Sequence, residues 1–415
     1  ITLIALVVTI VVLLILAGVS INALFGDSGI IQKAQDAQNK MDQAAQNDLD
    51  AINSLNEWLD NKTNGSTGGD DNPPTTSKIS TLVGKVVDKN TKAEDAYGNK
   101  ITIPKGFKIL PHGTEADSAT YTYSGDNIPA VQDGIVIENG EDGNQFVWVP
   151  VGTINNKTGD SKGATSTITL GRYEFDSSTG ALKSNIPAQV ASVGNCTQEV
   201  TINTYYKELS VFREGNSVKD STAENATARD LKTFIETSLT NGGYYIARFE
   251  ASKNTTTNKI ESQYDKTVLA DTQPNAAKLA REMYGEVKEN NELVYASDLV
   301  NSYAWDTAII FIQTYSTEID ASSYASKNKG TSRANTGINN DKYCNIWDMS
   351  GNVYEWTTEY STYSVDSTFL PCVYRGGYCV GGSGRAVDYT SYRHYAVSTT
   401  SGYGLDGLRP LLYVK

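Results

Sequence analysis

The chain has 415 residues, a formal net charge of −13 and 39% hydrophobic residues. This hydrophobic content is typical of globular proteins, and the length is enough for about two or three domains. The negative charge argues against nucleic acid or an anionic membrane surface as the main partner, because both would repel the chain.

The N-terminal segment is apolar. Residues Ile1 to Gly26 include no charged side chain. As a helix rising about 1.5 Å per residue, this run is about 39 Å long, which is enough to cross a bilayer. An alanine-rich amphipathic pattern follows a Gly/Asp break, so residues 1–60 are predicted to form one long, broken helix.

The segment ITLIALVVTIVVLLILAG resembles the mature N-terminus of type IV pilins, which a peptidase cuts after a glycine. The resemblance implies a methylated N-terminus, assembly with other pilin subunits through residues 1–60, and membrane anchoring through residues 1–25 before assembly. It also implies an extracellular location on the cell surface or in a pilus. Pilins usually have Glu at the fifth position, where this chain has Ala5. A membrane anchor that never polymerises is the alternative.

The rest of the chain divides by composition. Residues 61–78 include no aliphatic or aromatic side chain and are predicted to be a flexible linker. Short strand-like runs and turn residues predict a small β-rich segment at 79–141 and a larger domain at 142–415. Helical patterns occupy Ala228–Ser238 and Leu293–Tyr315. Together they predict an α+β fold.

The larger domain has motifs in a recognisable order: FVWVPVG (146–152), GGYYIARFE (242–250), YAWDTAIIFIQ (303–313), NIWDMSGNVYEW (345–356), VYRGG (373–377) and GLRPLLYV (407–414). Together they resemble the formylglycine-generating-enzyme-like, or sulfatase-modifying-factor, domain. The resemblance covers about 142–415 and implies a loop-rich C-type-lectin fold. The residues themselves suggest scaffolding. Gly376 and Gly377 allow close backbone approach, and Arg375 and Arg409 can brace loops through bidentate hydrogen bonds.

Catalysis is not expected. The oxidase of the resembled family uses two cysteines beyond the RGG motif, whereas here only Cys379 follows it. The other cysteines are Cys196, Cys344 and Cys372, and either disulfides or isolated thiols fit them. The chain has two histidines and no zinc-ligand spacing. A cryptic oxidase would need a second cysteine close to Cys379 in space.

The resemblance also implies a calcium ion in the GNVYEW loop. Its ligands would be the side chains of Asp348 and Glu355 and the carbonyl oxygens of Gly351 and Val353. Mixed carboxylate and carbonyl ligands suit calcium. The alternative is that Glu355 braces the loop without an ion.

The C-terminal tail has an unusual composition. Residues 360–414 include no Lys, Glu, Gln, Met or Trp, and no Asn follows Asn352. This resembles the variable segment of proteins diversified by retroelements, in which a reverse transcriptase misreads template adenines. Randomised asparagine codons cannot produce the missing types. The alternative is an ordinary surface rich in Tyr, Ser and Gly. The predicted ligand-binding residues are Tyr378, Cys379, Val380, Ser383, Asp388, Tyr389, Tyr392, His394, Tyr395 and Tyr403.

The sequence thus predicts a pilin-anchored extracellular receptor or adhesin. Its lectin-like loops at 378–406 would bind a ligand on a host-cell, phage or environmental surface. Tyrosine-rich surfaces give rigid contact area at low entropic cost. One alternative is a major, structural pilin subunit, and a second is the cryptic oxidase.

Overall fold

The described part of the chain is built mainly from β-strands. The computed structural model describes residues 76–111, 128–183, 200–202, 206–208, 231–329, 332–361, 372–379, 388–396 and 405–415. Strands make up 33% of these residues and helices 20%. The predicted α+β class with a long N-terminal helix is therefore wrong, because strands predominate and no long apolar helix occurs among the described residues. The predicted helix at 1–60 itself lies outside them.

A small sheet opens the described region. It orders strands β1 (Ser77–Lys78), β2 (Thr91–Glu94) and β3 (Lys100–Ile103), and the one-turn helix α3 (Ile79–Leu82) follows β1. Ile79 of α3 and Ala93, Ile101 and Ile103 of the sheet are buried. Residues 101–103 of β3 are all buried, whereas Lys92 and Lys100 of the same sheet are exposed.

The largest sheet has seven strands in the order β14-β15-β22-β11-β6-β5-β4, and all neighbours are antiparallel. Strands β4 (Phe107–Ile109) and β5 (Val136–Asn139) come from the predicted 79–141 segment. The remaining strands are β6 (Gln145–Pro150), β11 (Gly243–Ala247), β14 (Glu286–Glu289), β15 (Glu292–Leu299) and β22 (Pro410–Val414). The central strands β6, β11 and β22 are buried along their whole length, which explains their continuous apolar sequences.

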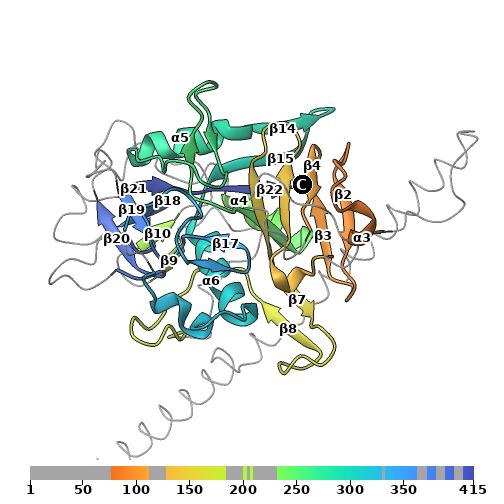
Figure 1. Cartoon of the computed structure of the whole chain (residues 1–415), viewed down its shortest axis with the longest axis horizontal. Helices are drawn as coiled ribbons and strands as arrows, with labels where there is room; N and C mark the ends of the chain where they lie inside the picture. The colour runs from red at the N-terminus through yellow and green to blue at the C-terminus, as the bar shows by residue number, and fades with distance from the viewer. Residues whose placement is uncertain are drawn as a thin grey trace, which may run out of the picture. The chain divides into compact units, whose positions relative to one another are not determined.

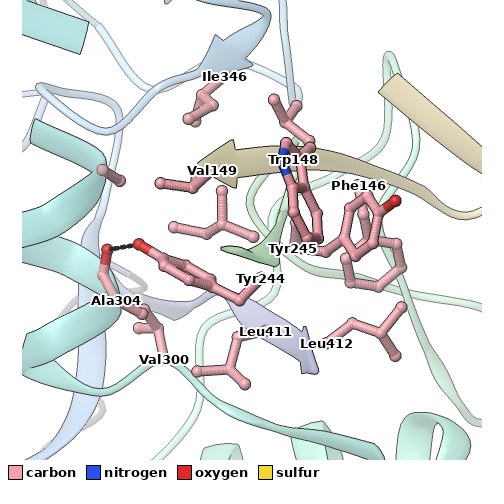
Figure 2. Packing of buried hydrophobic residues seen from close by; sticks show 14 of the residues in the cluster. Phe146, Trp148, Val149, Tyr244, Tyr245, Val300, Ala304, Ile346, Leu411 and Leu412 are labelled. Carbon is pink, nitrogen blue, oxygen red and sulfur yellow. Dashed lines mark hydrogen bonds between the residues drawn. The ribbon is translucent and has the colours of Figure 1, made fainter. Parts of the chain in front are cut away.

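The main hydrophobic core lies on the faces of this sheet (Figure 2). The rings of Trp148 and Tyr245 meet edge to face at 4.9 Å between centroids. On the other face, the Tyr244 hydroxyl donates to the Ala304 carbonyl oxygen at 2.6 Å (Figure 2), which ties the sheet to helix α6. Large aromatic side chains dominate the energetics of such a core.

A second sheet, with six strands, carries the C-terminal motifs. Its path is β20-β19-β18-β10-β9, and β21 pairs in parallel with β18. The strands are β9 (Val200–Ile202), β10 (Tyr206–Glu208), β18 (Tyr354–Ser361), β19 (Cys372–Arg375), β20 (Arg393–Ala396) and β21 (Asp406–Leu408). Figure 1 shows β18, β19 and β20 in blue at the left, and α3 and β2 in orange at the right.

The helices correct one sequence interpretation. Helix α4 (Leu231–Asn241) overlaps the predicted Ala228–Ser238, but the predicted helix Leu293–Tyr315 is wrong in its first third. Residues 292–299 form β15, and helix α6 (Ser302–Tyr315) begins only after Asn301, whose side chain accepts from the Ala304 amide at 2.9 Å. Asparagine at this N-cap position satisfies an amide that the helix leaves without a partner, and so fixes the boundary.

Smaller elements complete the description. They are helix α5 (Gln273–Tyr284), the 3-10 helices η1 (Val131–Asp133) and η4 (Ala321–Ser326), and the two-stranded pairs β7 (Gly152–Asn155) with β8 (Thr165–Ile168), β12 (Ser252–Lys253) with β13 (Ile260–Glu261), and β16 (Lys342–Tyr343) with β17 (Ile346–Trp347). No helix among the described residues has the length and apolarity that crossing a membrane requires.

Candidate ligand-binding site

The register of the second sheet separates aromatic from charged side chains. Tyr374 of the central strand β19 pairs with Trp356 of β18 and with His394 of β20. The next residue of β19, Arg375, pairs with Glu355 of β18 and with Arg393 of β20. Since successive residues of a strand point to opposite faces, the aromatic side chains share one face and the charged ones the other.

An aromatic row crosses the first of these faces. Tyr374 of β19 stacks on His394 of β20, with centroids 4.8 Å apart and an angle of 3° between the rings. Tyr354 of β18 lies 4.3 Å from Tyr374, and Tyr378 stacks on Tyr354 at 4.6 Å. Cross-strand aromatic pairs of this kind stabilise sheets by about 0.2–1 kcal/mol each.

The row continues beyond the sheet into the tail. Tyr392 lies 5.7 Å from His394, and Tyr389 meets Tyr392 edge to face at 5.2 Å. We call these rings the aromatic row: Tyr354, Tyr374, Tyr378, Tyr389, Tyr392 and His394. The first two are buried and the other four are partly exposed. The middle of the row is therefore scaffold, and its ends reach the surface.

Asp388 joins the row to the loop that precedes β20. Its carboxylate accepts a hydrogen bond from the Tyr354 hydroxyl, and its carbonyl oxygen accepts one from the Asn328 amide at 2.7 Å. Burial, followed by this hydrogen bond to Asp388, raises the pKa of Tyr354 above its ordinary value. The tyrosine therefore stays protonated as a donor at neutral pH.

The structure brings together five of the ten predicted ligand-binding residues. Tyr378, Asp388, Tyr389, Tyr392 and His394 gather as described. Cys379 lies close in sequence to the row, but its side chain is buried, its amide donates to the Asn352 carbonyl, and burial raises the pKa of its thiol. Tyr395 belongs to β20 without a described side chain, and Val380, Ser383 and Tyr403 lie outside the described residues.

A pocket of about 170 Å³ opens at the tail end of the row. Tyr389, Ser391, Tyr392 and Arg393 form one wall, and Glu174, Phe175 and Lys183 form the other. The second wall is a hairpin: Phe175 bridges Leu182, and the Lys183 amide donates to the Glu174 carbonyl at 3.0 Å. The sequence does not predict this wall, because no local pattern connects it with residues about 200 positions further along the chain.

A buried ion network supports the pocket wall. Arg393 binds Glu359 at 2.9 Å and Asp306 at 2.5 Å, Arg375 binds Asp306 at 2.5 Å, and Arg172 binds Glu359 at 2.5 Å. Burial opposes the ionisation of Glu359, but Arg393, Arg172 and Arg375 lower the pKa of its carboxyl to about 2. Three guanidinium groups face two carboxylates, so the network has a formal charge of +1.

Two glycines let the RGG motif pack closely against the backbone of Met349 and Ser350. Gly376 has a positive φ of 82°, and a Cβ there would lie 2.8 Å from the Met349 carbonyl oxygen. At Gly377, a Cβ would lie 2.5 Å from the Ser350 carbonyl oxygen. The predictions of close approach at both glycines and of loop bracing by Arg375 are confirmed.

The predicted calcium ligands are also in place but already have partners. Arg409 binds both Glu355 carboxylate oxygens, at 2.8 Å and 2.5 Å, so the predicted bracing role of Arg409 is confirmed. Asp348 is buried; one of its oxygens accepts from the Gly337 amide at 2.7 Å, and the other has no partner among the described residues. Gly351 and Val353 are buried beside them, and the Val353 amide donates to Glu250 at 3.1 Å.

This donor set does not fit calcium as it is placed. No group of three or more His, Cys, Asp or Glu side chains in the described residues could hold a metal ion. The arginine at Glu355 adds positive charge where a cation would bind. The arrangement favours the bracing alternative for Glu355 over the predicted calcium ion, and melting with and without calcium tests the choice.

No protein-family model matches the chain, and no curated protein matches it. Among solved structures, Treponema denticola variable protein 1 is a weak neighbour with 14% sequence identity and a TM-score of 0.22. The match covers 65% of this chain and 96% of that one.

Proposed function

We propose that this chain is a ligand-binding receptor whose binding face is formed by the exposed end of the aromatic row and the pocket beside it. One observation carries the proposal: Tyr389, Tyr392 and His394 are partly exposed at one end of the aromatic row, and Tyr389 and Tyr392 line the pocket there. Aromatic side chains held in this way lose little entropy on binding, so their contact area contributes efficiently to affinity.

The tail composition supports a variable binding face. Residues 360–414 lack Lys, Glu, Gln, Met and Trp, which adenine-directed randomisation of asparagine codons cannot produce. Such a process would change exposed row positions while the ion network and the RGG glycines hold the backbone. The ordered C-terminal motifs, which resemble formylglycine-generating-enzyme-like domains, would then serve as the scaffold.

A binding role agrees with the state of the cysteines. The side chains of Cys344 and Cys379 are buried and form no disulfide. Burial raises the pKa of Cys344 and of Cys379, which disfavours the reactive thiolate. We therefore propose a receptor and not an oxidase.

Surface attachment belongs to the same proposal. The charge-free run Ile1–Gly26 supports anchoring in a membrane, from which the receptor would face the extracellular medium. Ligands on host, phage or environmental surfaces would bind the exposed end of the aromatic row and the pocket beside it. Cell fractionation with antibodies against residues 76–415 tests the location, and recovery only in the soluble cytosolic fraction would contradict it.

The binding face is tested with the full-length chain in detergent. The wild type and the Tyr389→Ala/Tyr392→Ala double variant are applied to arrays of host, phage and bacterial surface glycans and proteins. We expect the wild type to select particular spots and the double variant to lose them. Tyr284→Phe, at a partly buried tyrosine of α5 outside the row and the pocket, is the control. Equal binding by the wild type and by the Tyr389→Ala/Tyr392→Ala variant would contradict the proposal.

A further inference from the structure

The pocket beside the aromatic row has a charge that differs from the rest of the chain. Glu174 and Lys183 of the hairpin and Arg393 of β20 line it. With the ion network behind Arg393, the cations are Arg172, Arg375, Arg393 and Lys183, and the anions are Asp306, Glu359 and Glu174. Four positive and three negative charges leave +1, whereas the whole chain has −13.

The charge at Arg393 is fixed. Burial opposes it, but Asp306 and Glu359 raise the pKa of the guanidinium, so it stays cationic at every physiological pH. Asp306 and Glu359 also hold the side chain in one position, because both are themselves buried. Lys183 is exposed, so its flexible side chain can move to contact a bound ligand. The Nε, Nη1 and Nη2 groups of Arg393 already donate to Glu359, Tyr173 and Asp306, so Arg393 acts on a ligand through its charge, whereas Lys183 can contact the ligand directly.

The walls and the size limit the ligand further. Phe175, Tyr389 and Tyr392 provide aromatic surface, and Ser391 provides a hydroxyl. The volume of about 170 Å³ corresponds to about six water molecules of liquid volume, so the pocket can accept one small ring or a terminal group of a larger molecule. Aromatic walls with few polar groups are typical of small-molecule sites.

We infer that the pocket binds a small ring bearing one carboxylate, with the carboxylate facing Lys183 and Arg393 and the ring against Phe175, Tyr389 and Tyr392. This rests on the proposed function, because the same tyrosines belong to the binding face. Glu174, the hairpin neighbour of Lys183, repels the anion and so lowers the affinity that Lys183 provides. Sugar acids and aromatic acids share this chemistry.

Titration calorimetry of the full-length chain with matched ligand pairs tests the inference. Glucuronate is compared with glucose, and benzoate with benzyl alcohol; each pair differs at the carboxylate. We expect at least one acid to bind at least about fivefold more tightly than its neutral partner. Preference for glucuronate would identify a sugar acid as the source, and preference for benzoate an aromatic acid. Affinity should fall as salt is raised, because the interaction is between charges.

Substitutions locate the site. Lys183→Gln should weaken the bound acid about fivefold, and Glu174→Gln should strengthen it by a similar factor. Lys85→Gln is the matched control: this exposed lysine follows α3, at the opposite side of the view from β20 (Figure 1). Equal effects of Lys183→Gln and Lys85→Gln would overturn the assignment.

The outcomes separate this inference from the proposed function. If neither acid binds more tightly than its neutral partner, but the Tyr389→Ala/Tyr392→Ala variant loses its array targets, the carboxylate inference fails and the receptor stands. If an acid binds and responds to Lys183→Gln while the double variant keeps every array target, the pocket chemistry stands and the proposed binding face fails.

Discussion

At the scale of single residues, Asp348 is a buried carboxyl group whose hydrogen bonding in the described core is incomplete. One of its oxygens has no partner there, and burial, which outweighs the Gly337 hydrogen bond, raises the pKa of its carboxyl to about 7. The folded protein therefore keeps a proton that the unfolded chain releases. The contribution of this group to the free energy of unfolding is complete below about pH 4 and is lost as the pH rises toward 7.

Replacing Asp348 with Asn removes this penalty. The neutral amide keeps an oxygen for the Gly337 amide and tolerates the positive φ of 62°. We expect Asp348→Asn to raise the free energy of unfolding at pH 8 by about 1–3 kcal/mol and to flatten its fall between pH 4 and 7. Urea unfolding at several pH values measures this, with Asp88→Asn as a surface control. Destabilisation at pH 8 would contradict the account.

Calcium is tested on the same two proteins. Because Arg409 binds both oxygens of Glu355, we expect the melting temperature of the wild type to be equal in millimolar calcium and in chelator. A ligand that binds the native state raises that temperature by mass action. A clear rise in calcium that Asp348→Asn abolishes would instead establish the ion at this loop.

At the scale of elements, the ion network ties α6, β18, β19 and β20 together. Asp306 comes from the helix, Glu359 from β18, and Arg375 and Arg393 from the two following strands. Buried charges of this kind stabilise a fold only while all partners are present, since removal of one leaves another desolvated and unpaired. The network therefore sets the position of the pocket wall.

Glu359→Gln tests this role. It leaves three guanidinium groups beside one carboxylate, and we expect a loss of about 3–5 kcal/mol in the free energy of unfolding. Because the pKa of Glu359 is lowered to about 2, the wild type should lose this contribution as the pH falls from about 4.5 to 2, and the variant should not. Glu282→Gln, at an exposed helix position, is the control. A loss below about 1 kcal/mol would show that the network is not needed.

The elements also show why sequence patterns failed in places. Leu293–Tyr315 has enough apolar residues to suggest one helix, but residues 292–299 pair with β22 as strand β15. Burial on both faces of a central strand removes the alternation that would identify it. Only the N-cap at Asn301 marks the boundary, and one asparagine is a weak signal beside such an apolar run.

At the scale of the whole molecule, the sequence was most informative about the tail. Tyr378, Tyr389, Tyr392 and His394 were expected to act together, and the structure stacks them in one row. Tyr354 and Tyr374 were missed as row members because they lie inside motifs that suggested scaffold. Glu174 and Lys183 could not be predicted, since only the tertiary fold brings their hairpin to the tail.

The central claim is that the exposed residues of 378–406 bind ligands and vary in sequence, while the ion network and the RGG glycines that support them are constant. Sequencing the gene from sister isolates tests it most directly. We predict that substitutions concentrate within 378–406, at positions such as Tyr389, Tyr392 and His394, and spare Arg375, Gly376 and the network carboxylates. Substitutions spread evenly over residues 76–415, or concentrated in the network itself, would contradict the claim.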